Sequence, residues 1–442
     1  MLEAKSRVMT EKARVYLQGV AAEASTMSPA KLADRITSLS GRHDDWRATE
    51  CLNLNPAETL ISRSARRLLD SDLATRVTEG YPGDKYYPHG RQNDFIDEIE
   101  GILIGTARDL FDADYVEWRP VSTSMANASV YFALLEPGDR IMAHDADHGG
   151  NDSYNLEGPP HLARLEVAPL PQLDSFRIDV DALRGAVMER RPRLIVVGAS
   201  NVLFPYPLEA IRDIADTVGA LVLYDAAHLG LLIATKDFQD PLREGAHIVT
   251  VSTHKNLCGP VGGMILTNEA ELAEKLMALQ YPTFVQTRDL NKYAAAAVSF
   301  LEMKAYGAEY SQQMIKNAQA LGEALSDVGF RLYGSAEGYT RTHQLMLDLR
   351  EGDPPSFEHR LLESNILLTL THVRGDEKRG FRTASRIATH EITRQGMKES
   401  HMETVAGLLR AASDGIPTDR TRSEIKEMLE SLPALQYSFD TP

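Results

Sequence analysis

Three short apolar segments constrain the fold of this 442-residue chain more than any other feature. Arg193–Ala199, Ala220–Tyr224 and His247–Thr253 are rich in β-branched residues and almost continuously hydrophobic, a pattern typical of strands buried on both faces. Between the first two lies a segment with one apolar helical face, formed by Leu208, Ile211, Ile214, Ala215 and Val218. A strand, a helix and a strand at this spacing form a βαβ unit, so we expect an α/β fold with a mostly parallel central sheet flanked by helices.

The length of the chain predicts more than one domain. Residues 1–50 have the pattern of helices joined by polar segments, and we interpret them as an N-terminal helical arm. Residues 51–295 hold the alternating strand and helix patterns of a large domain. An alanine-rich helix at Lys292–Tyr306 leads into residues 296–442, which are predicted to form a smaller α+β domain.

Composition excludes several classes of function. The formal net charge of −16 disfavours nonspecific binding to nucleic acid or to an anionic membrane. No apolar run approaches the roughly 20 residues that span a bilayer, and the N-terminus lacks the apolar core of a signal peptide. Cys51 and Cys258 have no metal-ligand spacing, so neither a metal site nor a disulfide framework is expected. A cytoplasmic enzyme fits these features.

A lysine after the third apolar segment carries the sharpest chemical signal. In VSTHKNLCGPVGG (Val251–Gly263), Lys255 follows a strand end and precedes a glycine-rich turn. Ligands of α/β proteins bind at the carboxyl ends of parallel strands, and a lysine buried there has a lowered pKa that favours imine formation. The alternative is a surface lysine beside a tight turn.

Three further motifs precede this lysine. Asp225, in YDAAH after the second apolar segment, is an acidic residue at a buried strand end, where it could pair with a protonated pyridine nitrogen or cap the next helix. PVSTSMAN (Pro120–Asn127) offers hydroxyls at a helix start, which suits a phosphate but also a plain serine cap. His148, before two glycines, could stack on an aromatic ring or lie in solvent. Together the four motifs predict a pyridoxal phosphate (PLP) site.

Six segments resemble the serine hydroxymethyltransferase family, from about residue 50 to residue 412. They are Glu79–Tyr87 (EGYPGDKYY), Asp94–Glu100 (DFIDEIE), Ala133–Ile141 (ALLEPGDRI), Asp147–Gly150 (DHGG), Val251–Gly263 and Arg386–Glu399 (RIATHEITRQGMKE). The resemblance implies PLP fold type I, the aspartate aminotransferase-like fold. It also implies a homodimer with shared active sites and a small amino-acid substrate.

Carried over by position, the resemblance implies a role for each site residue. Lys255 would bind PLP as an imine, Asp225 would pair with the pyridine nitrogen and His148 would stack on the ring. Glu58 falls on the family's acid/base glutamate, and Arg386 would bind the substrate carboxylate through its planar fork. Further cofactor-binding positions are Ser122, Thr123, Ser124, Ser200, His228, Ser252, His254, Gly262 and Gly263. Tyr81, Tyr86 and Tyr87 belong to the segment that reaches the neighbouring subunit's site.

Departures from the family motifs fall mostly on the substrate and folate side. They are Ala57 for a serine, Pro88–Gly90 for a double glycine, Val261 for an arginine, a changed loop at Tyr281–Asp289, Thr369–Thr371 for the N-K-N element and His390 for a proline. Three short segments resemble threonine transaldolases instead, namely Val116–Pro120, Gly338–Gln344 and Leu435–Asp440. This pattern indicates a retained cofactor site with a changed substrate.

Three functions remain open at this point. The first is a specialised aldol-type transferase, a transaldolase or hydroxymethyltransferase, that breaks or forms the Cα–Cβ bond of a β-hydroxy amino acid. An ordinary folate-dependent serine hydroxymethyltransferase is an alternative with the same chemistry. The second is β-elimination or decarboxylative deamination of a cysteine S-conjugate in a secondary-metabolite pathway. The third, a PLP-binding protein without activity, is disfavoured because Lys255, Asp225, His148 and Arg386 are all retained.

Overall fold

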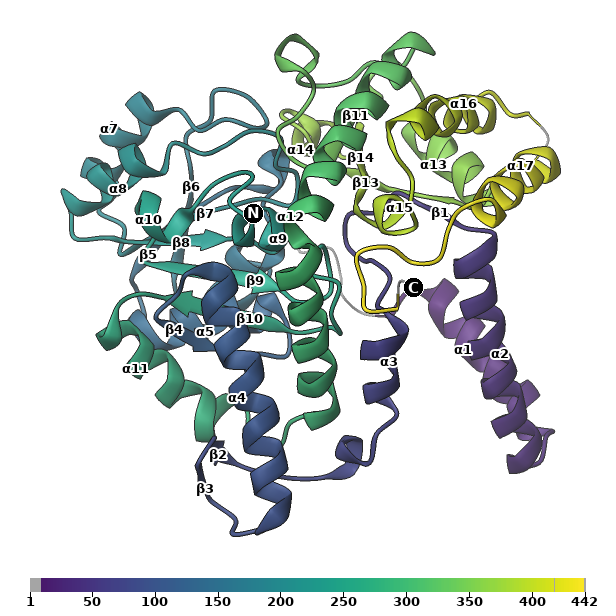
Figure 1. Ribbon diagram of the computed structural model, residues 1–442. Helices are drawn as coiled ribbons and strands as arrows, with labels where there is room; N and C mark the ends of the chain where they lie inside the picture. Colours follow the sequence, from purple (N-terminus) through teal and green to yellow (C-terminus); the bar gives the residue numbers. More distant parts are fainter. Residues whose placement is uncertain (1–8, 417, 441–442) are drawn as a thin grey trace.

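A seven-stranded sheet forms the centre of the molecule in the computed structural model, which describes residues 9–416 and 418–440 (Figure 1). In spatial order its strands are β4 (Tyr115–Glu117), β10 (Gly263–Thr267), β9 (Ile248–Ser252), β8 (Leu221–Asp225), β7 (Leu194–Val197), β5 (Arg140–Ala143) and β6 (Glu166–Pro169). Strand β10 runs antiparallel to both of its neighbours, and the other neighbouring pairs are parallel. The prediction of a mostly parallel α/β sheet is confirmed.

Alternate residues of each strand point into two separate hydrophobic cores, one on each face of the sheet. In β7, Leu194 and Val196 belong to one core, whereas Ile195 and Val197 belong to the other. The first core is covered by α5 (Thr123–Leu134), α11 (Ala270–Ala278) and the segment that follows α6 (Pro159–Leu162). The second is covered by α4 (Arg91–Phe111), α7 (Val180–Arg190), α8 (Leu208–Asp216), α9 (Gly230–Ala234) and α10 (Pro241–Glu244).

The three apolar segments form strands, as predicted, and the structure makes these strands neighbours. They lie in β7, β8 and β9, and the helix expected between the first two is α8. Four of the five residues predicted on its apolar face are buried. The fifth, Val218, lies beyond the end of the helix and packs against the same core.

The longest helix, α12 (Leu290–Asp327), has 38 residues and contacts both the second core of the sheet and a further core beyond it (Figure 1). The predicted helix at Lys292–Tyr306 is therefore too short. Its predicted end came just before Gly307, but this glycine lets the helix approach α9, since a Cβ there would lie 3.0 Å from Leu231. The predicted boundary between residues 295 and 296 falls within this continuous helix, and the division into three domains stays a prediction.

The C-terminal part is a small α+β structure. An antiparallel sheet of β11 (Gln344–Asp348), β14 (Ala384–Ala388) and β13 (Thr369–Thr371) is its centre. The accompanying helices are α13 (Pro354–Glu363), α14 (Asp376–Arg379), α15 (His390–Arg394), α16 (Met402–Ser413) and α17 (Thr418–Glu430). Strand β1 (Leu52–Asn53) crosses over from the N-terminal part and pairs with β12 (Ile366–Leu367), which brings the loop after β1 close to this sheet.

The N-terminal helices lie to one side of the molecule, away from the central sheet (Figure 1). Neither α1 (Glu11–Ser25) nor α2 (Pro29–Thr49) has a buried residue. Helix α3 (Arg63–Leu69) packs against α12, and β2 (Gly80–Tyr81) and β3 (Asp84–Lys85) form a hairpin before α4. Across residues 9–416 and 418–440, no helix is both long and apolar enough to cross a bilayer.

Candidate active site

A cavity lies at the carboxyl ends of β7, β8 and β9, where the fold predicts a ligand site. Nine of the residues predicted to bind the cofactor line it, namely Ser122, Thr123, Ser124, Ser200, Asp225, His228, Ser252, His254 and Lys255. These nine residues are spread over more than 130 positions of the sequence. The parallel sheet gathers them because each follows a strand end or begins the helix beside one.

Lys255 lies at the floor of this cavity. Its Nζ is 3.0 Å from Nε2 of His228, and burial lowers its pKa to about 8. The turn after it is fixed from two sides, since Asn256 Nδ2 donates to the carbonyl of His228 and the Gly259 amide donates to the carbonyl of Thr253. A surface lysine is therefore excluded, and the side chain is suited to imine formation.

Asp225 ends β8 with its carboxylate buried in the cavity wall. One oxygen accepts a hydrogen bond from Asn127 Nδ2 at 2.8 Å, and the other accepts from the amide of Ala227 at 2.9 Å. Burial raises its pKa, although the charge of nearby Lys255 acts in the opposite direction, and within residues 9–416 and 418–440 it forms no salt bridge with a lysine or arginine. It does not cap the next helix, because α9 begins only at Gly230. A carboxylate in this state fits a cationic ligand group.

The opposite side of the cavity is the start of α5. Ser122 is its cap and accepts a hydrogen bond from the amide of Met125 at 3.2 Å, while the hydroxyl of Thr123 bonds that of Ser252. Gly263 packs directly behind this turn, since a Cβ there would lie 2.5 Å from the Ser122 carbonyl oxygen. The helix start and its hydroxyls form a site for a phosphate.

His148 is largely buried rather than exposed to solvent. Its Nδ1 bonds the carboxylate of Asp145, and its Nε2 is buried without a hydrogen-bond partner in the described residues. Gly149 is required here, since its φ is +76° and a Cβ would overlap the side chain of Asn201. His148 does not line the cavity itself, and its stacking on a cofactor ring stays a prediction.

Arg386 reaches the cavity region from β14 of the small sheet. Its Nη1 donates to the carbonyl of Ser200 at 2.7 Å, and its Nε is buried without a partner among residues 9–416 and 418–440. Burial, with the nearby charge of Arg382, lowers its pKa to about 10. A structural role for Arg386, as the partner of the acidic residue Glu391, would be an alternative, but Glu391 pairs with Arg47 at 3.3 Å.

Other predicted residues lie outside this cavity. The Glu58 carboxylate is 47% exposed and pairs with Arg47 at 3.2 Å. The Tyr81 hydroxyl accepts from Arg119, and Tyr86 and Tyr87 lie exposed after the β2–β3 hairpin. Their roles, like those of all the predicted site residues, remain proposals.

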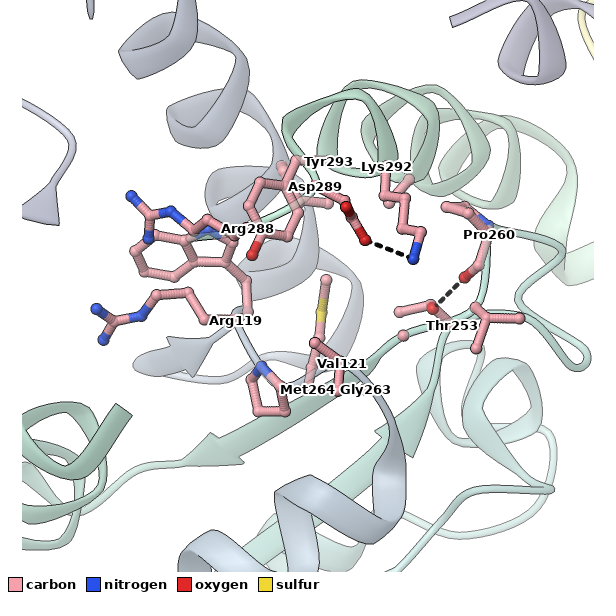
Figure 2. A pocket seen from close by; sticks show the side chains of 16 residues that line it. Arg119, Val121, Thr253, Pro260, Gly263, Met264, Arg288, Asp289, Lys292 and Tyr293 are labelled. Carbon is pink, nitrogen blue, oxygen red and sulfur yellow. Dashed lines mark hydrogen bonds and ion pairs between the residues drawn. The ribbon is translucent and has the colours of Figure 1, made fainter. Parts of the chain in front are cut away.

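A second cavity lies on the other side of the glycine-rich turn and includes Gly262 and Gly263 (Figure 2). Its charged groups are already paired. Lys292 pairs with Asp289 at 2.7 Å, and Arg119 is held by Glu117. Trp118 and Val121 supply much of the remaining wall. With its cations neutralised, this cavity is poorly suited to an anion.

Sequence reasoning missed the side chains behind the cofactor residues. Asn127 links Asp225 to Ser153 and accepts a hydrogen bond from Thr250 at 2.8 Å. It lies four residues after Thr123, on the same face of α5, which is a signal that could have been used. Asn151 and Tyr154 also line the cavity, but no motif marks them.

The residues present fit one cofactor. A buried amine, a buried carboxylate without a salt bridge and a helix start with hydroxyls match the aldehyde, pyridine nitrogen and phosphate of PLP. With the sheet described above, they define the class of fold-type-I PLP enzymes.

Comparison with known proteins specifies the family. The family model for serine hydroxymethyltransferase matches residues 31–409. The chain is 36% identical over 409 residues to the serine hydroxymethyltransferase of Pyrobaculum islandicum, which covers 92% of this chain and 94% of that protein. The enzymes of that name from Archaeoglobus fulgidus and Pyrococcus horikoshii are 37% and 35% identical, over 88% and 94% of this chain and 90% and 98% of their own lengths. The chain belongs to the serine hydroxymethyltransferase family of PLP-dependent transferases.

Proposed function

We propose that this chain is a specialised aldol-type transferase, which breaks the Cα–Cβ bond of a β-hydroxy amino acid such as threonine and passes the amino-acid fragment to another aldehyde. One observation supports the proposal: two of the changed segments lie beside Arg386, the residue proposed for the substrate carboxylate, while nine of the residues proposed for the cofactor line one cavity. Thr369–Thr371, which replaces the family's element near the folate site, forms β13, and Thr369 lies directly opposite Arg386. Its hydroxyl donates to Asn55, which also accepts from the amide of Ala57.

In this proposal each residue of the chain has a separate task. Arg386 binds the substrate carboxylate through paired charge-assisted hydrogen bonds. Lys255, with its pKa lowered to about 8, supplies an amine that is neutral far more often near neutral pH than an ordinary lysine. Asp225 holds a positive charge at the far end of the site. Bound PLP supplies the electron sink for the bond that breaks at Cα.

An ordinary folate-dependent hydroxymethyltransferase is the second candidate, supported by the names of the relatives. A single set of assays separates the candidates. With L-threonine and an acceptor aldehyde, the purified protein is expected to release acetaldehyde, and tetrahydrofolate is expected to accelerate cleavage of L-serine only weakly. Strong acceleration by tetrahydrofolate would favour the ordinary enzyme. Pyruvate or ammonia released from an S-alkyl cysteine, without acetaldehyde from threonine, would favour processing of a cysteine S-conjugate.

We further propose a homodimer that shares its active sites. Support comes from two exposed features: Tyr86, which is 70% exposed, and the apolar rim of the second cavity, where Val121 and Val261 are 52% and 56% exposed. Mixing Lys255→Ala with Tyr86→Ala, both of which are expected to be inactive alone, tests this. A shared site predicts that activity returns on subunit exchange, because one of the two sites then carries neither change. No recovery in exchanged dimers would contradict the sharing of sites.

A further inference from the structure

His228 Nε2 lies 3.0 Å from Lys255 Nζ, and the charge of this lysine also lowers the pKa of His343 and of His390. The functions above use none of these three buried histidines fully. His228, His343 and His390 are 6%, 1% and 0% exposed. They come from three places in the chain, namely the loop between β8 and α9, the residue before β11 and the start of α15. The rings of His343 and His390 lie edge to face, with centroids 5.1 Å apart. In each of the three, Nδ1 is buried without a hydrogen-bond partner in the described part of the chain.

The hydrogen bond of His390 fixes which of its nitrogens can accept a proton. Its Nε2 lies 2.7 Å from the backbone carbonyl oxygen of Glu58, and a carbonyl oxygen can only accept. Nε2 therefore carries the hydrogen, and Nδ1 has a bare lone pair. Burial lowers the pKa of His390 to about 4, with a further contribution from the charge of Lys255, so the ring is neutral near pH 7. A neutral imidazole with a free lone pair is a hydrogen-bond acceptor and a base.

The backbone around His390 is held firmly. The hydroxyl of Tyr310 donates to the carbonyl of His390 at 2.7 Å, and the hydroxyl of Thr389 donates to the carbonyl of Met314. Both Tyr310 and Met314 lie on α12, so this helix fixes the turn between β14 and α15. The same turn continues directly from β14, which carries Arg386. His390 thus lies four residues after the arginine proposed for the carboxylate, is bonded to the loop of Glu58 and is near enough to Lys255 for the charge of this lysine to lower its pKa. A buried acceptor without a donor is unfavourable, and a ligand donor would remove this cost.

We propose that Nδ1 of His390 accepts the hydrogen bond of the substrate's β-hydroxyl and takes its proton when the Cα–Cβ bond breaks. The inference rests on the proposed aldol-type function. The hydroxyl oxygen becomes the carbonyl oxygen of the departing aldehyde, and the bonding electron pair stays with Cα. In the reverse direction, the same proton returns from Nδ1 to the oxygen of the incoming aldehyde. His390 stands where the resembled motif has a proline, so it belongs with the substrate-side changes of this chain.

Two substitutions separate the roles of the two ring nitrogens. In His390→Gln, the amide can still donate to the carbonyl of Glu58, but the acceptor at Nδ1 is lost. In His390→Asn, a polar atom remains near the position of Nδ1, but the bond to Glu58 is lost. If His390 has only a structural role, His390→Gln should impair threonine binding less than His390→Asn. If Nδ1 accepts a hydrogen bond from the substrate, His390→Asn should impair it less. His359→Asn, at an exposed side chain on α13, is the matched control.

The quantity measured is the affinity for L-threonine and for L-2-aminobutyrate, which differ only in the β-hydroxyl. It is obtained from the change in absorbance of the PLP-loaded protein as each amino acid is added. We expect the preference for threonine to fall about tenfold in His390→Gln, as for the loss of one hydrogen bond, and to be better retained in His390→Asn. An unchanged preference in His390→Gln, or an equal loss of affinity for both amino acids, would overturn the inference. If the unchanged protein binds neither amino acid, the proposed function fails instead.

Discussion

Replacing Arg386 by lysine tests the substrate geometry most directly. Lysine keeps the positive charge but lacks the planar fork that holds both carboxylate oxygens. In the structure the guanidinium donates only to the Ser200 carbonyl, and its Nε has no partner among the described residues. The substrate carboxylate is therefore expected to accept hydrogen bonds from the guanidinium N–H groups that no protein atom accepts.

The expected size of the effect follows from the burial of this charge. Burial and the charge of Arg382 lower the pKa of Arg386 to about 10, and a lowering of this size corresponds to roughly 3 kcal/mol of unfavourable charge burial. A bound carboxylate offsets that cost. Loss of a paired, charge-assisted hydrogen bond in such a site costs on the order of 3 kcal/mol. Arg386→Lys should therefore bind amino acids roughly a hundredfold more weakly.

Amino-acid titrations of the two PLP-loaded proteins, followed by cofactor absorbance, measure this directly. The spectrum before amino acid is added should be the same in both, because Arg386 is proposed to contact substrate and not PLP. Arg331→Lys, at an exposed arginine paired with Glu351, serves as the control for an arginine-to-lysine change. Equal affinities of Arg386→Lys and the unchanged protein would refute the reasoning and show that the carboxylate is bound elsewhere.

Four further predictions concern the cofactor side. Lys255→Ala should show no imine absorbance that borohydride removes; its persistence would mean that another lysine binds PLP. Asp225→Asn should retain PLP but lose at least about tenfold in turnover, because the pyridine nitrogen loses the carboxylate that keeps it protonated; full activity would make the carboxylate structural. Imine formation by the apoprotein should accelerate as pH rises through about 8, where Lys255 loses its proton, and a rise only near pH 10 would contradict its lowered pKa. Gly263→Ala should lower the unfolding free energy by about 1–3 kcal/mol, measured by thermal unfolding, and weaken PLP binding, since its Cβ would meet the Ser122 backbone.

The sequence predicted the parts of the site that depend on strand ends. Lys255 and Asp225 follow continuous apolar segments, and such segments lie side by side in a parallel sheet, so their meeting could be expected. The contact between His343 and His390 could not, because it depends on how β11 and β14 pair in the small sheet.

Two other features also required the folded chain. The position of the Glu58 carboxylate depends on the pairing of β1 with β12 and on Arg47, which lies on α2. The length of α12 was underestimated because a glycine inside a helix is unfavourable by itself, and only the contact with α9 shows why it is accepted at Gly307.

Helix α12 also has a consequence for how the chain unfolds. Its first half contributes Phe300 and Met303 to the core of the large sheet, and its second half contributes Leu321 and Leu325 to the core of the small one. If the core of the large sheet unfolds, the first half of α12 becomes exposed and its second half, which packs in the small core, loses support. The same holds in the opposite direction. The two cores are therefore expected to melt in a single cooperative transition rather than one after the other. Because Lys255 follows a strand of the large sheet and Arg386 lies in the small one, loosening of either core is expected to disturb the position of both residues.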